Sequence, residues 1–374
     1  MKYAPLYSAV LFSLFTFIEI DAIGQSQPEN SLTTAEHLEA SGWWPTKGDA
    51  DRKLFLGNDA CAMCHESIVA PQAMTPMFHS GSPASQSRIL ETHPTLNFRE
   101  GEFTTNIRST PDGVLYSVSD GSQTTNLTAV WALGSPQKGQ TYILKQGDDY
   151  YESRVSYFIK LDGLDITVGH APSVPEDIKT AVGRKLQARE VRLCFGCHTT
   201  ASMTPGIASP DKALPGVTCE ACHGPGAKHV ESIEASDAKK GAGRQKAMFN
   251  LGLLSPAESV DFCGACHKTW ADVLEMPSVQ GAVEIRYQPY RLEQSQCWGK
   301  RGDPRITCVA CHNPHKPLVH DPEAYDSNCL ACHSQRLDKT AFSPENSVCK
   351  VATGKCVTCH MPKYSANPWR IHRP

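Results

Sequence analysis

Alternating apolar and polar positions mark one part of the chain, between residues 98 and 169. Three runs rich in β-branched and aromatic residues each end at turn-forming residues: 114–118 before Asp120-Gly121, 141–145 before Gly147-Asp148-Asp149, and 150–158 before Asp162-Gly163. Such runs, punctuated by Asp-Gly, are typical of antiparallel hairpins. The pattern predicts a small antiparallel sheet, and we place this β-rich insert at residues 98–172.

Elsewhere the apolar positions follow helical spacing in short stretches. Helix-start signals are found at Thr33-Thr34-Ala35-Glu36, at Ser255-Pro256-Ala257-Glu258 and at Asp321-Pro322-Glu323. The first two are capping boxes, and the last two place proline at the first helical position. Short helices joined by loops rich in glycine and proline predict a mainly α chain with many loops.

The first residues read as a secretory signal. Lys2 is followed by an apolar run over residues 10–18, and Ala22-Ile23-Gly24 offers a small-x-small cleavage site. An uncleaved membrane anchor is the alternative. Glu19 and Asp21 interrupt the run well before the roughly 20 apolar residues that a membrane-spanning helix needs. The segment predicts an exported, periplasmic protein without a membrane span.

The strongest signal is a pentad, Cys-x-x-Cys-His, that occurs seven times. Its residues are Cys61, Cys64 and His65; Cys194, Cys197 and His198; Cys219, Cys222 and His223; Cys263, Cys266 and His267; Cys308, Cys311 and His312; Cys329, Cys332 and His333; and Cys356, Cys359 and His360. This pentad is the attachment signature of c-type haem. The two thiols form thioether bonds to the porphyrin, and the imidazole becomes the proximal iron ligand.

Zinc sites and disulfide scaffolds are the other uses of Cys-x-x-Cys. Neither places a demand on the next residue, yet all seven units are followed by histidine, which makes up only 15 of the 374 residues. The repeated pentad therefore predicts seven covalently attached c-type haems, each with one iron.

The spacing of the pentads predicts how the haem segment is stabilised. Six of them lie between residues 194 and 360, with about 28 residues for each haem, fewer than the roughly 40 that usually fold on their own apolar core. We therefore expect a fold organised around the haems, which must lie close together. The expected parts are a signal peptide (1–24), a tether with a short helix (25–54), a first-haem segment (55–97), the insert (98–172) and a six-haem segment (173–374).

Eight histidines lie outside the pentads: His37, His79, His93, His170, His229, His315, His320 and His372. Of these, His79, His170, His229, His315 and His372 are the candidate distal iron ligands, with hydrogen bonding to a haem propionate as the alternative role. His315 and His229 follow a proximal histidine too closely to reach the opposite face of the same porphyrin. If they bind iron, it belongs to a neighbouring haem.

Two cysteines remain, Cys297 and Cys349. In an oxidising compartment a disulfide between them is the leading interpretation, and a reactive thiol near a haem is the alternative. The net charge of −3, without long runs of one sign, argues against nucleic acid as a partner. Redox partner proteins, a donor and an acceptor, are the expected partners.

Several motifs in a fixed order resemble those of a known group. They are Leu56-Gly57-Asn58-Asp59-Ala60-Cys61 with Thr75-Pro76-Met77; Gly216-Val217-Thr218-Cys219 through Gly226 and His229; Cys297 before Ile306-Thr307-Cys308 through His315; and Cys356 through Met361-Pro362-Lys363. The group is the multihaem cytochromes c related to the tetrahaem cytochrome that accepts electrons from hydroxylamine oxidoreductase. This chain has no tetratricopeptide extension and no Cys-x-x-Cys-Lys motif.

The resemblance implies electron transfer in the periplasm and supports His229 and His315 as distal ligands of neighbouring haems. The sequence hypothesis is thus a seven-haem electron carrier in which distal histidines close most irons to substrate. The first rival is an oxidoreductase in which one iron, at the first haem, stays open for a small nitrogen or sulfur compound. The second rival is a filament-forming or surface-attached wire subunit.

Overall fold

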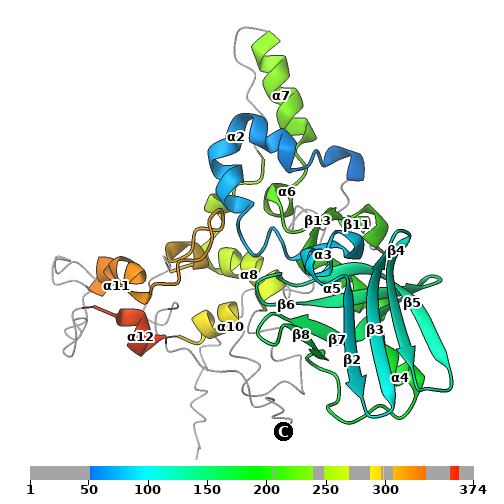
Figure 1. Cartoon of the computed structure of the whole chain (residues 1–374). Coiled ribbons are helices and arrows are strands. Elements are labelled where there is room, and N and C mark those ends of the chain that lie inside the picture. Colours follow the sequence, from blue (N-terminus) through cyan, green and yellow to red (C-terminus); the bar gives the residue numbers. More distant parts are fainter. Residues whose placement is uncertain are drawn as a thin grey trace, which may run out of the picture. The chain divides into compact units, whose positions relative to one another are not determined.

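The structure is a computed structural model that describes residues 51–204, 207–238, 248–268, 287–295, 298, 306–333 and 354–361. Within these residues a large β-sheet and a set of short helices account for most of the regular structure (Figure 1). The helices carry the pentads, and the sheet carries none of them.

The sheet has nine strands and is antiparallel throughout. Its main path runs in sequence order through β2 (Thr95–Glu100), β3 (Phe103–Thr110), β4 (Gly113–Ser119), β5 (Thr124–Leu133), β6 (Gly139–Gln146), β7 (Asp149–Phe158) and β8 (Gly163–Ile166). Two short strands are added beside this path, β1 (Gly81–Pro83) on β5 and β9 (Gly183–Lys185) on β7. The hairpins predicted from the three runs are confirmed as β4–β5, β6–β7 and β7–β8.

Alternation of side chains explains the sheet. In β4 every second residue is buried, and Val114, Tyr116 and Val118 all point into one core. Tyr116 lies opposite Leu127 of β5, so that the apolar faces of neighbouring strands coincide. The core continues through Tyr142 of β6 and is closed on one side by α4 (Ile178–Val182).

The expected fold class, mainly α with a small β insert, is wrong. The sheet curls until β2 approaches β8, so it is nearly closed, and it contains the largest apolar core among the described residues. The sequence prediction underestimated the extent of the sheet because strands such as β3 and β5 carry threonine and asparagine on their outer faces. Those residues hide the period-two pattern, which is set by the buried positions alone.

The longer helices are α2 (Asn58–Gln72), α5 (Ala188–His198), α7 (Ala227–Ala238), α8 (Pro256–His267) and α11 (Asp326–His333), and the shorter ones are α3 (Arg88–Thr92), α6 (Cys219–His223), α10 (Gln288–Glu293) and α12 (Cys356–His360). Two-residue strands pair as β10 (Thr199–Thr200) with β13 (Leu214–Pro215) and β11 (Met203–Thr204) with β12 (Ile207–Ala208). Among the described residues no helix combines the length and the apolar character required to cross a membrane.

The predicted helix starts can be compared with two of these helices. The capping box is confirmed at α8, where Ser255 Oγ accepts from Glu258 N at 3.3 Å and Ser255 N donates to Glu258 Oε2 at 2.8 Å. Asp321 caps a 3₁₀ turn (Pro322–Tyr325) that leads into α11. The box predicted at residues 33–36 lies outside the described part of the chain.

Candidate haem sites

Most pentads end a helix at their histidine. The second, fourth and sixth form the last turns of α5, α8 and α11, while the third and seventh make up α6 and α12 entirely. The first lies inside α2, which is kinked at His65, and the fifth begins with a 3₁₀ turn. In each helix the two thiols and the imidazole are therefore brought together within about one turn.

Two pentad histidines have one ring nitrogen held by a backbone carbonyl group. His198 Nδ1 lies 2.9 Å from the carbonyl oxygen of Ser80, and His223 Nδ1 lies 2.9 Å from that of Phe249. A carbonyl oxygen only accepts hydrogen bonds, so Nδ1 carries the proton in both rings. The lone pair then lies on Nε2, the tautomer that a proximal haem ligand needs. These residues fit the role of c-type haem ligands.

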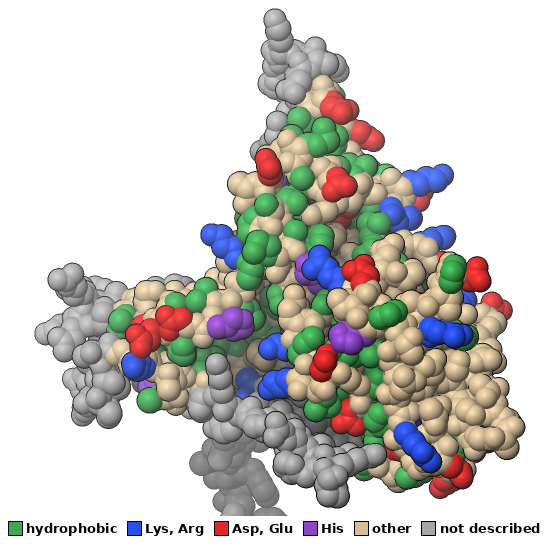
Figure 2. All heavy atoms as spheres, in the orientation of Figure 1, with side chains coloured by type: hydrophobic (Ala, Val, Ile, Leu, Met, Phe, Trp, Pro, Cys, Tyr) green, Lys and Arg blue, Asp and Glu red, His purple; other side chains and the backbone are tan. Residues whose placement is uncertain are grey.

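The surfaces around the pentads also fit a bulky apolar group. Large hydrophobic side chains are exposed beside the first pentad at Leu56, Met63, Ile68 and Met74, beside the fifth at Val309, Leu318 and Val319, and beside the sixth and seventh at Leu330 and Met361. Hydrophobic side chains are visible at the surface in Figure 2. A porphyrin attached at these pentads would cover side chains of this kind.

The first cysteines of the pentads come together in three pairs. The thiols of Cys61 and Cys219 lie close enough to share a hydrogen bond, as do those of Cys263 and Cys308 and those of Cys329 and Cys356. The pentads are thus paired as first with third, fourth with fifth, and sixth with seventh.

Further contacts join these pairs. Cys197 Sγ, in the second pentad, donates to the carbonyl oxygen of Ala265 in the fourth at 3.6 Å. Cys222 of the third pentad is near enough to Cys263 of the fourth to influence its ionisation. The ring of His312 in the fifth pentad meets that of Tyr325, just before α11, edge to face at 5.6 Å. The second, third and fourth pentads are therefore joined to one another, whereas the fifth reaches the sixth only through Tyr325, four residues before it.

His315 lies beside the histidine of another pentad. Its ring is nearly parallel to that of His223, at 10°, and the two ring centroids are 5.9 Å apart. Burial, followed by the nearby His223, lowers the pKa of His315. The structure thus brings together a candidate distal ligand that follows the fifth pentad and the candidate proximal ligand of the third.

His79 belongs to segment 77–81, which contacts two pentads. Met77 O accepts from Val217 N at 2.9 Å just before the third pentad, and Ser80 binds His198 of the second. Gly216, with φ at +68°, approaches this segment so closely that a Cβ would collide with the carbonyl oxygen of Phe78. Only glycine combines that conformation with that approach.

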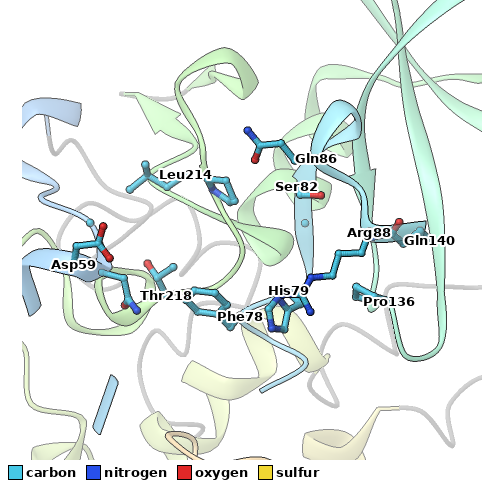
Figure 3. Close-up of a pocket in the computed structure, with 14 residues that line it drawn as sticks. Asp59, Phe78, His79, Ser82, Gln86, Arg88, Pro136, Gln140, Leu214 and Thr218 are labelled. Atoms are coloured by element: carbon cyan, nitrogen blue, oxygen red, sulfur yellow. The ribbon is translucent and has the colours of Figure 1, made fainter. Parts of the chain in front are cut away.

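A pocket of about 310 Å³ lies beside His79. Its lining includes Asn58 and Asp59 from the start of α2, Arg88 from α3, and Thr218 from the start of α6. Figure 3 shows the His79 ring beside the Arg88 side chain. Burial, and then the charge of Arg88, lowers the pKa of His79, which favours the neutral ring.

His170 and His93 make other contacts. His170 Nε2 lies 3.1 Å from Glu152 Oε2, which Arg184 also binds. His93 meets Thr92 through Nδ1 and Asp162 through Nε2. His170 as a distal ligand stays a prediction, and it would require this contact with Glu152 to be exchanged for iron.

The remaining predicted positions are only partly described. His229 lies in the first turn of α7, and His320 lies in an exposed stretch before α11. His37, His372, Cys297 and Cys349, and with them the proposed disulfide, fall outside the described residues, as does the side chain of Cys332.

Sequence reasoning missed two carboxylates that join pentads, Glu220 and Asp326. Glu220 is one of the unspecified residues of the third pentad, yet it is only 1% exposed. Asp326 begins α11 and binds backbone at the start of α12. A buried acidic residue inside a short helix is unusual, but burial cannot be read from one sequence position.

Comparison with known proteins gives a family match for one part of the chain. Residues 170–224, which hold the second and third pentads, match the family model described as "Cytochrome c554 and c-prime". No curated protein matches the chain. The match supports a c-type cytochrome, in which the haem iron is bound covalently through its porphyrin.

Among solved structures, one described as "Crystal Structure of Outer Cell Wall Cytochrome OcwA" is similar at 20% sequence identity, with a TM-score of 0.32. The alignment covers 57% of this chain and 37% of that one, so the chain spans well under half of that protein's length.

Proposed function

We propose that this chain, a c-type cytochrome that carries electrons on covalently bound haem, holds seven haems and passes electrons between redox partner proteins in the periplasm. Each pentad supplies two thioether anchors and one proximal ligand. The ordered motifs support a family relationship with the tetrahaem cytochrome that accepts electrons from hydroxylamine oxidoreductase. The signal peptide, the domain limits and the Cys297–Cys349 disulfide belong to this proposal.

The connected series of pentads is the observation that carries the proposal. Contacts between the described residues lead from the first pentad to the third, fourth and fifth, with the second joined at the fourth. From the fifth they continue through Tyr325 to the helix of the sixth, which contacts the seventh. Pentads in contact require their porphyrins to be close neighbours. Closely spaced redox centres are what electron transfer through a protein needs, and every haem would have at least one neighbour.

The residues around the third haem support closed, six-coordinate iron. Haem iron exchanges one electron without otherwise changing the protein. Imidazole nitrogen binds a metal at about 2 Å, so two imidazoles on opposite sides of one iron have ring centres about 6 Å apart. The 5.9 Å between His223 and His315 fits that arrangement. His315 would then bind the iron of the third haem and tie the fifth pentad to it.

The first test is haem content, followed by spin state. Mass spectrometry of the purified protein should show seven haems, and the ferric EPR spectrum should be low-spin and unchanged by cyanide or nitrite. Fewer than seven haems would contradict the count. A high-spin fraction worth about one haem in seven that responds to cyanide would contradict the closed conduit and favour the rival below.

A variant tests the distal ligand. We expect His315→Met to keep all its haem and to raise one reduction potential, because methionine in place of the second histidine raises the potential of haem iron. His320→Met is the matched control, since His320 lies five residues further along and is exposed. If the two variants have the same potentials and the same EPR spectrum, His315 does not bind iron.

The pocket beside His79 favours a second candidate function. It adjoins the start of α2, the helix that carries the first pentad, and it offers Arg88 and His79 to a small anion. If His79 left the first iron open, the protein would be an oxidoreductase for a small nitrogen or sulfur compound. Nitrite or hydroxylamine turnover that is lost in Arg88→Gln but kept in Arg52→Gln would support this function.

A further inference from the structure

The Glu220 carboxylate joins the third pentad to the first. Its Oε1 accepts from Leu56 N at 2.9 Å and from Gly226 N at 2.8 Å, and its Oε2 accepts from Gly57 N at 2.8 Å. Leu56 and Gly57 immediately precede α2, the helix of the first pentad, and they lie more than 160 residues from Glu220 in sequence. The side chain is 1% exposed, so these backbone donors replace the water that the carboxylate has lost.

Asp326 joins the sixth pentad to the seventh in the same way. It is the first residue of α11, whose last turn is the sixth pentad, and it is the only carboxylate of that helix. Its Oδ2 accepts from Lys355 N at 2.5 Å and its Oδ1 from Cys356 N at 2.8 Å, at the start of α12. Hydrogen bonds from these two N–H groups lower the pKa of Asp326, which keeps it charged.

Both carboxylates occur where two pentads bring their first cysteines together. Cys61 and Cys219 flank the contact made by Glu220, and Cys329 and Cys356 flank the one made by Asp326. In each case a carboxylate on one helix binds consecutive backbone N–H groups at the start of the other. Bonds of this charge-assisted kind are short and directional, so they fix both the distance and the rotation between the two helices.

We propose that Glu220 and Asp326 are positioning residues that set the mutual orientation of the first–third and sixth–seventh haem pairs. The inference rests on the proposed function, because it requires haem at these pentads. Neither residue touches haem as ligand or anchor; each acts through the backbone of the helix that its partner pentad occupies.

The test is the Soret circular dichroism of the intact holoprotein, because neighbouring haems give a two-signed band whose amplitude depends on their relative orientation. Glu220→Gln and Asp326→Asn keep the side-chain size but place an amide N–H₂ against backbone donors. Each variant should lose part of the amplitude per haem, and the double variant about the sum of the two losses, because separate sites add.

Haem content by mass is measured first, and the amplitude is expressed per bound haem, so loss of haem cannot imitate the effect. Asp177→Asn is the matched control, since Asp177 also accepts from a backbone N–H but caps α4, away from every pentad. Glu220→Asp keeps the charge and should restore part of the signal if Glu220→Gln does not mature.

Absence of haem would refute the proposed function itself. Full haem content with an unchanged Soret band in Glu220→Gln and Asp326→Asn would refute the positioning role alone. An equal loss in Asp177→Asn would also refute it, because the effect would then not depend on the pentad contacts.

Discussion

The sheet and the segment that holds the last three pentads are stabilised in opposite ways. In the sheet, side chains such as Ile107, Tyr116 and Leu144 are fully buried, and they belong to one continuous apolar core. In residues 306–333 and 354–361, no residue whose burial is described is buried. The difference is not one of composition alone, because the second region has apolar residues such as Val309 and Met361, which remain exposed.

The comparison shows what each region needs in order to fold. The sheet buries its apolar surface against itself, with every strand paired along an ordered path. The pentad segment buries almost none, so its own chain offers little to offset the entropy lost on folding. Haem attached at each pentad would supply the missing interior, as a structural metal does in small metal-binding domains.

The largest expected effect comes from removing haem altogether. When the full chain is made without haem attachment, we expect strands β2–β8 to keep slow amide hydrogen exchange. The helices α11 and α12 should exchange at once, because their stabilising core is missing. Hydrogen exchange followed by mass spectrometry measures both regions in one sample, with the holoprotein as the control. Protection of α11 and α12 without haem would contradict the comparison.

A smaller and more local effect is expected within the sheet. Arg154 and Glu100 form a two-point ion pair, at 2.9 Å and 2.7 Å, and both side chains are at most 4% exposed. Arg154→Met would remove the guanidinium from beside the buried Glu100 carboxylate, and breaking a buried ion pair in this way typically costs about 3–5 kcal/mol. Thermal or denaturant unfolding of the holoprotein should show this loss in far-UV signal from the sheet, while the Soret spectrum stays unchanged.

The double variant Arg154→Met with Glu100→Gln serves as the control. Replacing both partners also removes the buried charge of Glu100, so much of the lost stability should return. The return should be incomplete, because Arg154 also donates to the carbonyl oxygens of Ala171 and Ser173 on the way to the second pentad. If the double variant is as unstable as Arg154→Met, the buried charge of Glu100 is not the cause.

The sequence predicted local features well where one residue type has one physical use. Ser255 with Glu258 formed the expected capping box, and the Asp-Gly pairs near residues 120 and 162 marked real hairpin turns. The pentads located the candidate haem sites because haem attachment requires two thiols and an imidazole at this fixed spacing in the sequence. These features depend on neighbours within a few residues, which a sequence displays directly.

The extent of the sheet and the contacts among pentads could not be predicted in this way. β1 pairs with β5 across about 50 residues, and Glu220 binds Leu56 across 164. Such contacts depend on which surfaces meet in the folded chain. The burial of Glu220 is equally nonlocal, since a glutamate in a short helix is ordinarily exposed. His315 was a candidate from its spacing, but only the fold pairs it with His223.

The smallest predicted effect tests how well the side chains of the sheet satisfy one another in its apolar core, where no pentad lies. Tyr142 in β6 is fully buried, and its hydroxyl has no hydrogen-bond partner among the described residues. Burial raises the pKa of this phenol, so it stays neutral. Tyr142→Phe removes a polar atom that has lost its water, and we expect the holoprotein to gain about 1 kcal/mol in free energy of unfolding.

The matched variant is Tyr157→Phe in the neighbouring strand β7, where the change in side chain is identical but the setting is not. Tyr157 is also fully buried, and its hydroxyl donates to Asp162 Oδ1 at 2.6 Å. Loss of this hydrogen bond should lower the free energy of unfolding by about 1 kcal/mol. The two variants should therefore shift denaturant unfolding in opposite directions. Equal shifts of the same sign would mean that the sheet interior tolerates unpaired hydroxyls, and that its core is less self-sufficient than its burial indicates.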